Sequence, residues 1–473
     1  MVAVLLAVLL SFNNTLVANP SDEAMLQWAK KVGAQKMPEK TTMFKVKDYD
    51  AVNDGKTLTT KAIQAAIDDC AAKGGGIVTF EPGSYLTGSI FIKEGVNLRI
   101  DKEVTILGSQ DISDYPEIDT RVAGIEMKWP AALINIIGQD NAAITGEGTV
   151  HAQGKPFWDK YWTMRKEYDP KGLRWIVDYD CKRPRTLLIS NSSNVTLKGI
   201  TLKQAGFWTV HILYSKYVTI DGLVILNNVD GSGPSTDGID IDSSTFILVE
   251  NCDIDCNDDN FCLKAGRDAD GLRINQPTEY VVIRDCISRK GGGLITCGSE
   301  TSGSIRHILA YNLKAKGTKI GIRFKSAKTR GGTVEDIHYR DIEMDGVGTA
   351  IEVSMNWNPS YSYSSLPEGY SFENIPQHWK TMLEKVEPPE KGIPEVKDVY
   401  LSRIRVTGGS RAISASGMAE SIVKNFYFKD VNIEADTAGQ ISYGKGWKFE
   451  DVSIRTKDNS KFKVENCSDM NLW

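Results

Sequence analysis

The chain has 473 residues, of which 41% are hydrophobic and 25% are charged, and this ordinary globular composition excludes a disordered or fibrous protein. Its length is enough to bury a large core. The formal net charge of −5 provides no basic surface for nucleic acid or an anionic membrane, which argues against a nucleic-acid-binding function.

The first residues, MVAVLLAVLLSFNNTLVANP, contain an apolar run that is short and close to the start for a membrane span. Residues 1–18 are therefore predicted to be a signal peptide ending near Ala18, with a short N-terminal anchor as the alternative. A signal peptide implies a secreted or periplasmic protein, in which residues 19–473 form a single domain. We expect this domain to be monomeric.

The stretch LTTKAIQAAIDDCAAKGGG predicts an amphipathic helix. Ile63, Ala66, Ile67 and Cys70 share one face at helical spacing, and Gly74 provides the stop signal. This helix is expected to cover the open end of a solenoid, because a stack of repeats must cap its terminal unit.

From residue 194 onward one pattern recurs, as in NVTLKGITL, YVTIDGLVI and YVVIRDCIS. Its spacing of 21 to 34 residues, with one longer gap, is typical of stacked structural repeats. Within each unit, apolar residues alternate with polar ones, which is the period of a strand with one buried face. Short strands at this spacing, without long crossover helices, predict an all-β right-handed parallel β-helix.

The seventh position of every repeat unit is apolar and is predicted to lie in the interior. These residues are Ile200, Leu223, Cys252, Cys286, Leu313, Ile342, Ile404, Val431 and Val452. The spacing of the eight cysteines fits no compact disulfide framework or zinc site. Cys252 and Cys286 are thus interpreted as buried thiols, with a bridge between neighbouring units as the open alternative.

A second strand occurs in several units, and its leading edge carries acidic residues. Asp237 is the first residue of DGIDIDS, and the pair Asp258-Asp259 lies in CNDDNFC, about one unit later. A turn, a calcium loop and an acid/base pair all fit CNDDNFC by itself. Because neighbouring strands lie about 4.8 Å apart, we expect the three carboxylates to meet, and like charges this close raise the pKa of one member.

Alternation along the same strands turns several further side chains outward onto one sheet. They are Asp240, Asp242, Lys264, Arg323 and Lys325. The cations can hold one carboxylate ionised while another stays protonated, which is the environment that a general acid and a general base need. Basic residues also suit an acidic sugar, since Arg binds a carboxylate bidentately and Lys binds it as a point charge.

Residues 356–394 break the rhythm and predict a long aromatic loop packed on the solenoid wall. Its aromatic residues are Trp357, Tyr361, Tyr363, Tyr370 and Trp379. They could serve as platforms for sugar rings or form the core of the loop itself.

The segments STDGIDI, NDDNFCLKAGRD, GGGLITCGSE and GIRFKS together resemble glycoside hydrolase family 28, the polygalacturonase family, whose motifs are N-T-D, D-D, G-H-G and R-I-K. The resemblance covers roughly residues 44–460. It implies inverting hydrolysis of α-galacturonosyl linkages in pectin, an acidic plant cell-wall polysaccharide, without a metal or another cofactor. Inverting enzymes usually separate their two carboxyl groups by roughly 6.5–9.5 Å.

The resemblance also implies roles for individual residues. By position, Asp258 matches the general acid, while Asp237 and Asp259 match the residues that hold and deprotonate water. Arg323 and Lys325 match the pair that binds the sugar carboxylate.

Two other segments, KAGRDADG and FWTVH, are similar to exo-acting bacterial relatives. They add Lys264, Arg267 and His211 as substrate-binding candidates, with His211 lining the cleft. Together with the aromatic loop they favour a blocked cleft and exo action.

The sequence departs from the family pattern at Ser235, which replaces an asparagine, and at Gly292, which replaces a histidine. Loss of the imidazole is expected to leave a space about one ring in size beside the carboxylates. Family members that act on rhamnogalacturonan tend to lack this histidine. Gly292 therefore predicts a galacturonosyl-rhamnose linkage as substrate, with homogalacturonan as the alternative.

Two rival functions stay open. A polysaccharide lyase on the same architecture would hold calcium, for which Asp237, Asp240, Asp258 and Asp259 could be ligands. A non-catalytic carbohydrate-binding solenoid would bind the polymer without turnover.

Overall fold

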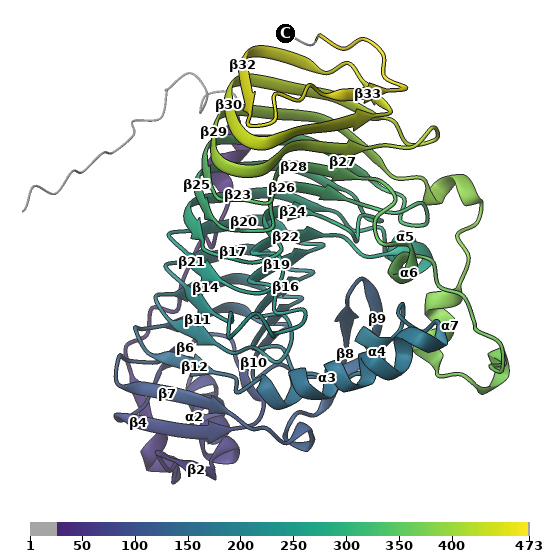
Figure 1. Cartoon of the computed structure of the whole chain (residues 1–473). Helices are drawn as coiled ribbons and strands as arrows, with labels where there is room; N and C mark the ends of the chain where they lie inside the picture. The colour runs from purple at the N-terminus through teal and green to yellow at the C-terminus, as the bar shows by residue number, and fades with distance from the viewer. Residues whose placement is uncertain (1–25, 472–473) are drawn as a thin grey trace, which may run out of the picture.

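The computed structural model describes residues 26–471 and shows a coil of parallel strands that climbs through the whole chain (Figure 1). Each turn of the coil contributes strands to three parallel sheets, and equivalent strands of successive turns pair in register. The predicted parallel β-helix is thereby confirmed. The predicted signal peptide lies outside the described residues.

The first sheet, called the site sheet below, carries the acidic leading edge. It consists of β5 (Ile90–Ile92), β10 (Ile134–Ile137), β13 (Leu187–Ser190), β16 (Val210–Leu213), β19 (Ile239–Asp242), β22 (Phe261–Lys264), β24 (Gly293–Cys297), β26 (Ile320–Lys325), β28 (Thr349–Ser354) and β33 (Lys463–Glu465), with the C-terminal parts of β29 (Glu395–Ser416) and β30 (Val423–Ser442).

The second sheet contains β1 (Met43–Lys45), β3 (Gly76–Thr79), β6 (Val96–Arg99), β11 (Asp140–Thr145), β14 (Ser193–Lys198), β17 (Lys216–Asp221), β20 (Thr245–Glu250) and β31 (Gly444–Lys445). The third contains β2 (Asp54–Leu58), β4 (Gly83–Thr87), β7 (Val104–Gly108), β12 (Thr149–His151), β15 (Thr201–Lys203), β18 (Val224–Leu226) and β21 (Asp253–Asp255). Long strands bend from the second sheet into the third, namely β23 (Thr278–Ser288), β25 (Ile305–Lys316), β27 (Thr333–Asp345), β32 (Lys448–Thr456), β29 and β30.

The interior is filled by the apolar half of each alternating strand. Ile239 and Ile241 of β19 stack on Phe261 and Leu263 of β22, and all four are fully buried. The predicted seventh-position residues are buried as well, except Val452 in the last turn, which is partly exposed. Cys252 and Cys286 belong to this ladder as free thiols, with the backbone N–H of Cys252 donating to Sγ of Cys286 at 3.4 Å.

Helix α2 (Thr60–Ala72) occupies the predicted position at one end of the coil (Figure 1). Ile63, Ala66, Ile67 and Cys70 are completely buried on its inner face. The helix ends before the glycines at 74–76, whose φ angles of +84°, +101° and +156° suit residues without a side chain. The capping role predicted from the sequence is therefore confirmed.

Insertions between the turns build a wall that faces the site sheet (Figure 1). They comprise the antiparallel hairpin of β8 (Glu117–Val122) and β9 (Ile125–Pro130), the helices α3 (Lys155–Tyr168), α4 (Val177–Asp180), α5 (Asp268–Ile274), α6 (Pro359–Ser362) and α7 (Gln377–Leu383), and short 3-10 segments at Ile112–Asp114, Asp169–Lys171, Phe372–Asn374 and Pro389–Gly392. The wall has its own aromatic core, in which Trp129, Trp175, Tyr361 and Trp379 are buried. Tyr361 and Trp379 of the 356–394 loop thus pack into a core that the loop shares with the other insertions.

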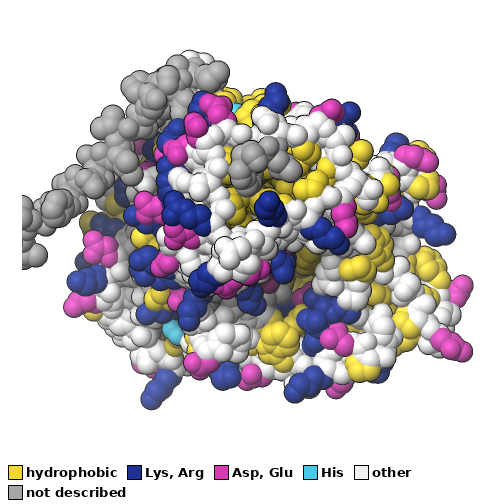
Figure 2. All heavy atoms as spheres, turned by 45° about the horizontal axis from the view of Figure 1, so that its top comes forward, with side chains coloured by type: hydrophobic (Ala, Val, Ile, Leu, Met, Phe, Trp, Pro, Cys, Tyr) yellow, Lys and Arg dark blue, Asp and Glu magenta, His cyan; other side chains and the backbone are white. Residues whose placement is uncertain are grey.

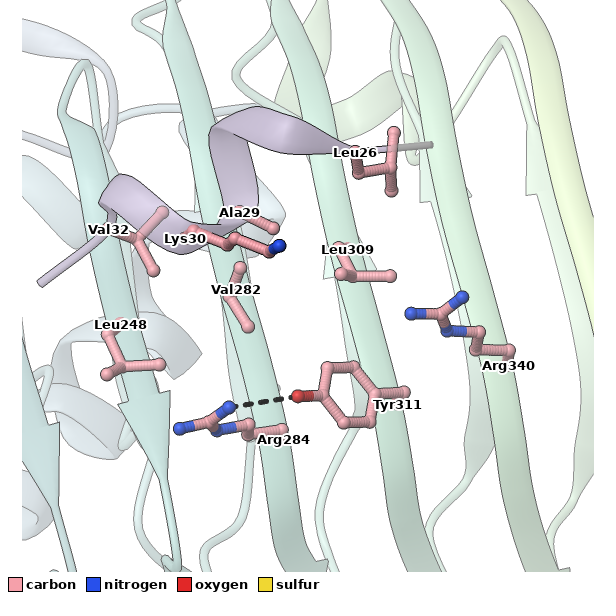
Figure 3. Close-up of a pocket in the computed structure, with 10 residues that line it drawn as sticks. All are labelled: Leu26, Ala29, Lys30, Val32, Leu248, Val282, Arg284, Leu309, Tyr311 and Arg340. Carbon is pink, nitrogen blue, oxygen red and sulfur yellow. Dashed lines mark hydrogen bonds between the residues drawn. The ribbon is translucent and has the colours of Figure 1, made fainter. Parts of the chain in front are cut away.

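The segment that leads into the coil runs along the outer surface of the second sheet. Its 3-10 helix η1 (Gln27–Lys31) and the strands β20, β23, β25 and β27 enclose a cavity of about 290 Å³ (Figure 3). Leu248, Val282 and Leu309 form the apolar floor of this cavity, and Arg284 donates to the hydroxyl of Tyr311 at 3.0 Å. A further short helix, η2 (Val46–Tyr49), follows β1.

Charged side chains of both signs are intermixed over the face shown in Figure 2. Across residues 26–471, no helix is long and apolar enough to cross a membrane.

The interior ladder makes a clear prediction for stability. Ile283 of β23 is fully buried between Val249 and Ala310, so Ile283→Ala leaves a cavity and should lower the free energy of unfolding by about 2–5 kcal/mol. Leu226→Ala deletes as many carbon atoms from a side chain that is 39% exposed, and we expect a loss of under about 1 kcal/mol. Urea unfolding followed by circular dichroism measures both, and equal losses would contradict this assignment of the core.

Candidate active site

The three carboxylates at the leading edge of the site sheet come together as predicted. Asp237 precedes β19, Asp258 and Asp259 precede β22, and these two strands pair directly. One oxygen from each carboxylate lies within 4.8 Å of the others. These oxygens lie nearer to one another than the roughly 6.5–9.5 Å by which inverting glycosidases usually separate their two carboxyl groups.

Burial and charge divide the three carboxylates into two kinds. Burial raises the pKa of Asp237 well above its usual range, and repulsion from Asp258 adds to the rise. Burial also raises the pKa of Asp258, together with repulsion from Asp259. For Asp259, burial alone would raise the pKa, but the charges of Lys325 and Arg323 outweigh it and hold the pKa far below the usual range. The site thus contains one firmly ionised carboxylate beside two that hold protons more tightly.

Lys325 and Arg323 project from β26 toward Asp259. Nζ of Lys325 lies 2.8 Å from Oδ2 of Asp259, and the Arg323 guanidinium lies 3.7 Å from Oδ1. Arg323 also pairs with Glu352 of β28 at 2.9 Å. Arg323 keeps 16% of its side chain exposed toward the pocket, whereas Lys325 is 7% exposed. Arg323 is therefore the freer of the two to bind a substrate carboxylate.

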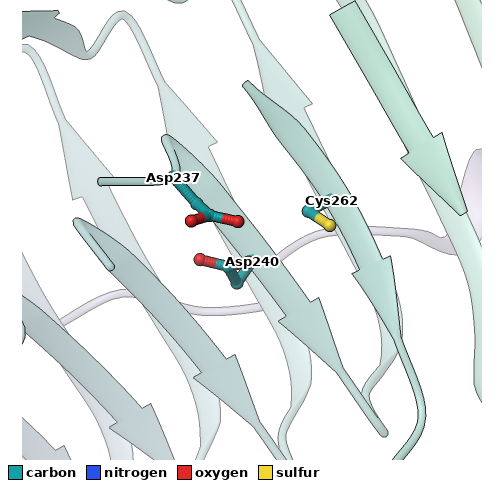
Figure 4. A group of neighbouring side chains, drawn as sticks. All are labelled: Asp237, Asp240 and Cys262. Carbon is teal, nitrogen blue, oxygen red and sulfur yellow. The ribbon is translucent and has the colours of Figure 1, made fainter. Parts of the chain in front are cut away.

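Lys264 lies among three further carboxylates. Its Nζ is 3.8 Å from Asp237, 3.5 Å from Asp240 and 3.5 Å from Glu300, and it lies 4.7 Å above the ring of Trp208. Figure 4 shows the side chains of Asp237 and Asp240 next to each other, with Cys262 on the neighbouring strand. Burial raises the pKa of Asp240 well above normal, although Lys264 opposes the rise.

This arrangement is poorly suited to the calcium site of a lyase. Calcium prefers six to eight oxygen ligands that are free to turn toward the ion. Here the two lysine ammonium groups already provide positive charge to the carboxylates, at 2.8 Å for Asp259 and at 3.5 Å for Asp240. The site therefore supplies its own cations.

A small pocket of about 160 Å³ opens between the site sheet and the wall of insertions. Its lining includes Asp237, Asp258, Lys264, Arg323 and Lys325 from the sheet, Ser299 and Glu300 from the segment after β24, and Ala123, Arg174, Asp178, Phe207, Trp208, Ser235, Trp357, Asn358 and Tyr361 around them. Trp357 stacks above Nζ of Lys325 at 4.6 Å. The pocket thus combines acidic, basic and aromatic groups within one small volume.

Two predicted substrate-binding residues do not line this pocket. His211 is completely buried, accepts a hydrogen bond at Nδ1 from Arg185 at 2.8 Å, and meets Trp208 edge-on. Burial lowers the pKa of His211 to about 4, so the ring is neutral and can accept this bond. The expectation that His211 lines the cleft is therefore wrong, since it packs behind Trp208.

Arg267 is also completely buried. It pairs with Asp268 at 2.8 Å, donates to the Tyr179 hydroxyl at 3.0 Å, and reaches the carbonyls of Tyr361 and Ser362 at 3.4 Å. Its contacts join α4, α5 and α6 to one another. The structure corrects the binding role predicted for Arg267, which instead anchors the wall of the pocket.

The space beside Gly292 differs from the expectation as well. A Cβ at this position would lie 3.1 Å from Oδ1 of Asp259 and 3.3 Å from Oδ1 of Asp258. An imidazole here would require the carboxylates to move. The prediction of an open, ring-sized space at this point is thus wrong.

Sequence reasoning assigned no role to Glu300, Arg174, Asp178 or Trp208, which also line the pocket. Glu300 lies three residues after the end of β24. This position, close to the end of a strand in the site sheet, could have indicated from the sequence that Glu300 lies near the pocket. Arg174 and Asp178 lie in an insertion without strand periodicity, where only tertiary packing brings them to the sheet. They form an ion pair at 2.6 Å.

Comparison with known proteins identifies the family. A family model described as glycosyl hydrolases family 28 matches residues 81–378. A second model, described as rhamnogalacturonase A/epimerase, pectate lyase-like, matches residues 43–117.

Relatives match over most of the chain. A probable polygalacturonase of Vitis vinifera is 33% identical over 321 residues, which are 66% of this chain and 62% of the relative. An exo-poly-alpha-D-galacturonosidase of Dickeya chrysanthemi is 24% identical over 469 residues, 88% of this chain and 74% of the relative. This chain thus spans less than two thirds of the grapevine relative's length.

A solved structure agrees with these matches. The exopolygalacturonase of Thermotoga maritima superposes with a TM-score of 0.78 at 25% identity, over 92% of this chain and 96% of that one. Because the first family model spans well over half of the sequence and includes every carboxylate described above, the chain belongs to glycosyl hydrolases family 28.

Proposed function

We propose that the protein is an exo-acting hydrolase that removes galacturonic acid from the end of pectin chains. The observation that carries this proposal is the small pocket, which places the pair Asp237 and Asp258 beside the partly exposed side chain of Arg323. Its volume of about 160 Å³ lies below the usual range of about 300–1,000 Å³ for ligand pockets and suits one terminal sugar unit.

In the proposed mechanism, Asp258 protonates the oxygen of the leaving sugar. Asp237 and Asp259 hold the attacking water, and the water's proton passes to this pair. Asp259 is fully buried and is hydrogen-bonded to Lys325, which disfavours it as a covalent nucleophile. Direct attack by water inverts the anomeric carbon, and NMR of the first-formed product tests this against retention.

The linkage preference also follows from the site. The expectation of a galacturonosyl-rhamnose linkage rested on the histidine missing at Gly292 and on an open space beside it. The short distances from the Cβ position of Gly292 to Asp258 and Asp259 remove the second of these supports. The curated relatives named as acting on galacturonan favour a galacturonosyl-galacturonate linkage. The lyase alternative is disfavoured by the lysines among the carboxylates, and the predicted secreted or periplasmic location agrees with a polymeric substrate.

A product profile tests the proposal. Tetragalacturonate should release monosaccharide from the first minutes, without absorbance from an unsaturated product, and EDTA should leave the rate unchanged. Parallel kinetics on rhamnogalacturonan oligosaccharides should give a lower kcat/KM. Early release of dimers and trimers would contradict exo action, and faster cleavage of rhamnogalacturonan would restore the alternative linkage.

Asp258→Asn should lower kcat by at least about 1,000-fold, because the amide cannot donate the proton that the leaving group needs. The same substitution should raise stability at neutral pH. The pKa of Asp258 is higher in the folded protein than in the unfolded chain. As the pH rises above the pKa of an ordinary aspartate, the unfolded chain therefore loses this proton more readily, and the free energy of unfolding falls.

This stability gain should therefore vanish at about pH 3, where folded and unfolded chains both hold the proton. Asp253→Asn is a matched control on the third sheet, where Asp253 pairs with Arg289 at 2.6 Å. Thermal unfolding at both pH values and initial rates of sugar release measure these effects. Equal rates for Asp258→Asn and the parent would show that Asp258 is not the acid.

Arg323→Ala should raise KM for tetragalacturonate by about tenfold or more, because the freer of the two basic groups would no longer bind the sugar carboxylate. Methyl esterification of the substrate should weaken binding to the parent by a similar factor and have little further effect on the variant. Lys325→Ala should reduce kcat in addition, because Lys325 holds Asp259 ionised.

Arg306→Ala serves as the control, since Arg306 pairs with Glu279 on the outer surface at 2.6 Å. Steady-state kinetics on free and esterified oligomers separate the two effects. A parent enzyme that is indifferent to esterification would show that Arg323 has no part in substrate recognition.

A further inference from the structure

We infer that Glu300 is a specificity residue that accepts a hydrogen bond from the free 4-hydroxyl of the terminal sugar, and that this contact restricts cleavage to chain ends. The inference rests on the proposed function and names the side chain that would recognise the end of the polysaccharide. It is carried by the placement of a buried, pocket-lining carboxylate that approaches the same lysine, Lys264, as Asp237.

Glu300 lines the pocket although its side chain is only 5% exposed. Within residues 26–471, the one side chain that hydrogen-bonds to its carboxylate is Lys264, at the long distance of 3.5 Å. Burial alone would raise the pKa of Glu300, but the charges of Lys264 and Lys325 lower it, so the group is ionised. An ionised acceptor with so weak a partner gains most from a hydroxyl donor in the pocket.

An acidic residue would repel the carboxylate of a galacturonosyl unit. The pocket therefore has two different sides, with Arg323 of β26 on the side that attracts the substrate carboxylate and Glu300 on a side that favours hydroxyl groups. Trp208 offers an aromatic surface next to Lys264, and such surfaces pack against sugar rings.

Asp237 and Glu300 both approach the ammonium group of Lys264. Lys264 is 3.8 Å from the first and 3.5 Å from the second, so the two carboxylates are at most the sum of these distances apart. In a pyranose, C4 lies across the ring from C1. We place C1 of the terminal unit at Asp237 and its 4-hydroxyl at Glu300, since both carboxylates line the same small pocket.

The turn of the β8–β9 hairpin holds Glu300 in place. Gly124 has a φ of +92°, and a Cβ on it would lie 2.7 Å from Cγ of Glu300 and 2.7 Å from Cγ of Arg267. Because this turn packs closely against the side chain, it restricts the movement of the carboxylate. An internal sugar unit has no proton on O4, so it would leave the buried charge without a partner, which costs binding energy.

The test compares two trigalacturonates that differ only in the terminal unit, one natural and one lacking the 4-hydroxyl. We expect the parent enzyme to show a kcat/KM at least about 100-fold higher for the natural compound, because a site built to bind a hydroxyl rejects the analogue that lacks it. Glu300→Ala should lower kcat/KM about 100-fold for the natural compound and less than about threefold for the deoxy compound. Glu300→Gln, a variant of equal size, should fall between.

Glu279→Gln is the matched control, since Glu279 pairs with Arg306 on the outer surface, and both compounds should react with it as with the parent. If Glu300→Ala lowered kcat/KM equally for both compounds, the inference would be overturned and Glu300 would have a structural role. If the parent enzyme cleaved the natural and the deoxy compound with equal kcat/KM, that result by itself would overturn the inference. A parent that cleaves neither compound would refute the proposed function, whereas rapid cleavage of both would refute only the role of Glu300.

Discussion

The spacing of parallel strands is the constraint on which the site depends. Neighbouring strands lie about 4.8 Å apart, so Asp237 before β19 and Asp258-Asp259 before β22 must share a small volume. Concentrating three carboxylates is costly, and the same stacking offsets the cost by placing Lys264 on β22 and Lys325 on β26, two strands further along the sheet. The coil thus produces both the acidic cluster and the cations that make it stable.

Burial then gives chemically identical side chains different properties. Asp259 is fully buried and stays ionised, because Lys325 and Arg323 approach it directly. Among residues 26–471, no cation lies as close to Asp237 or Asp258, so burial and repulsion between carboxylates raise the pKa of both. A proton donor and a permanently charged neighbour therefore arise from adjacent residues of one sequence.

The insertions convert this open sheet surface into a pocket. Arg267 ties α4, α5 and α6 together from within, and Trp208 rests on the neutral His211. Both residues resemble binding groups in sequence, yet they act as supports beneath the surface that a substrate would touch. Under the proposed function, enclosure by this wall selects a chain end over the middle of a polymer.

The sequence by itself determined the coil, the capping helix and the meeting of the three aspartates, because these follow from periodic alternation and from a fixed distance between strands. It also indicated Arg323 and Lys325 through their place in that period. Only the tertiary structure decided the pocket walls, the inclusion of Glu300 and Trp208, the burial of His211 and Arg267, and the crowding beside Gly292. These features depend on how non-repeating insertions pack against the coil, and such packing leaves no regular pattern along the chain.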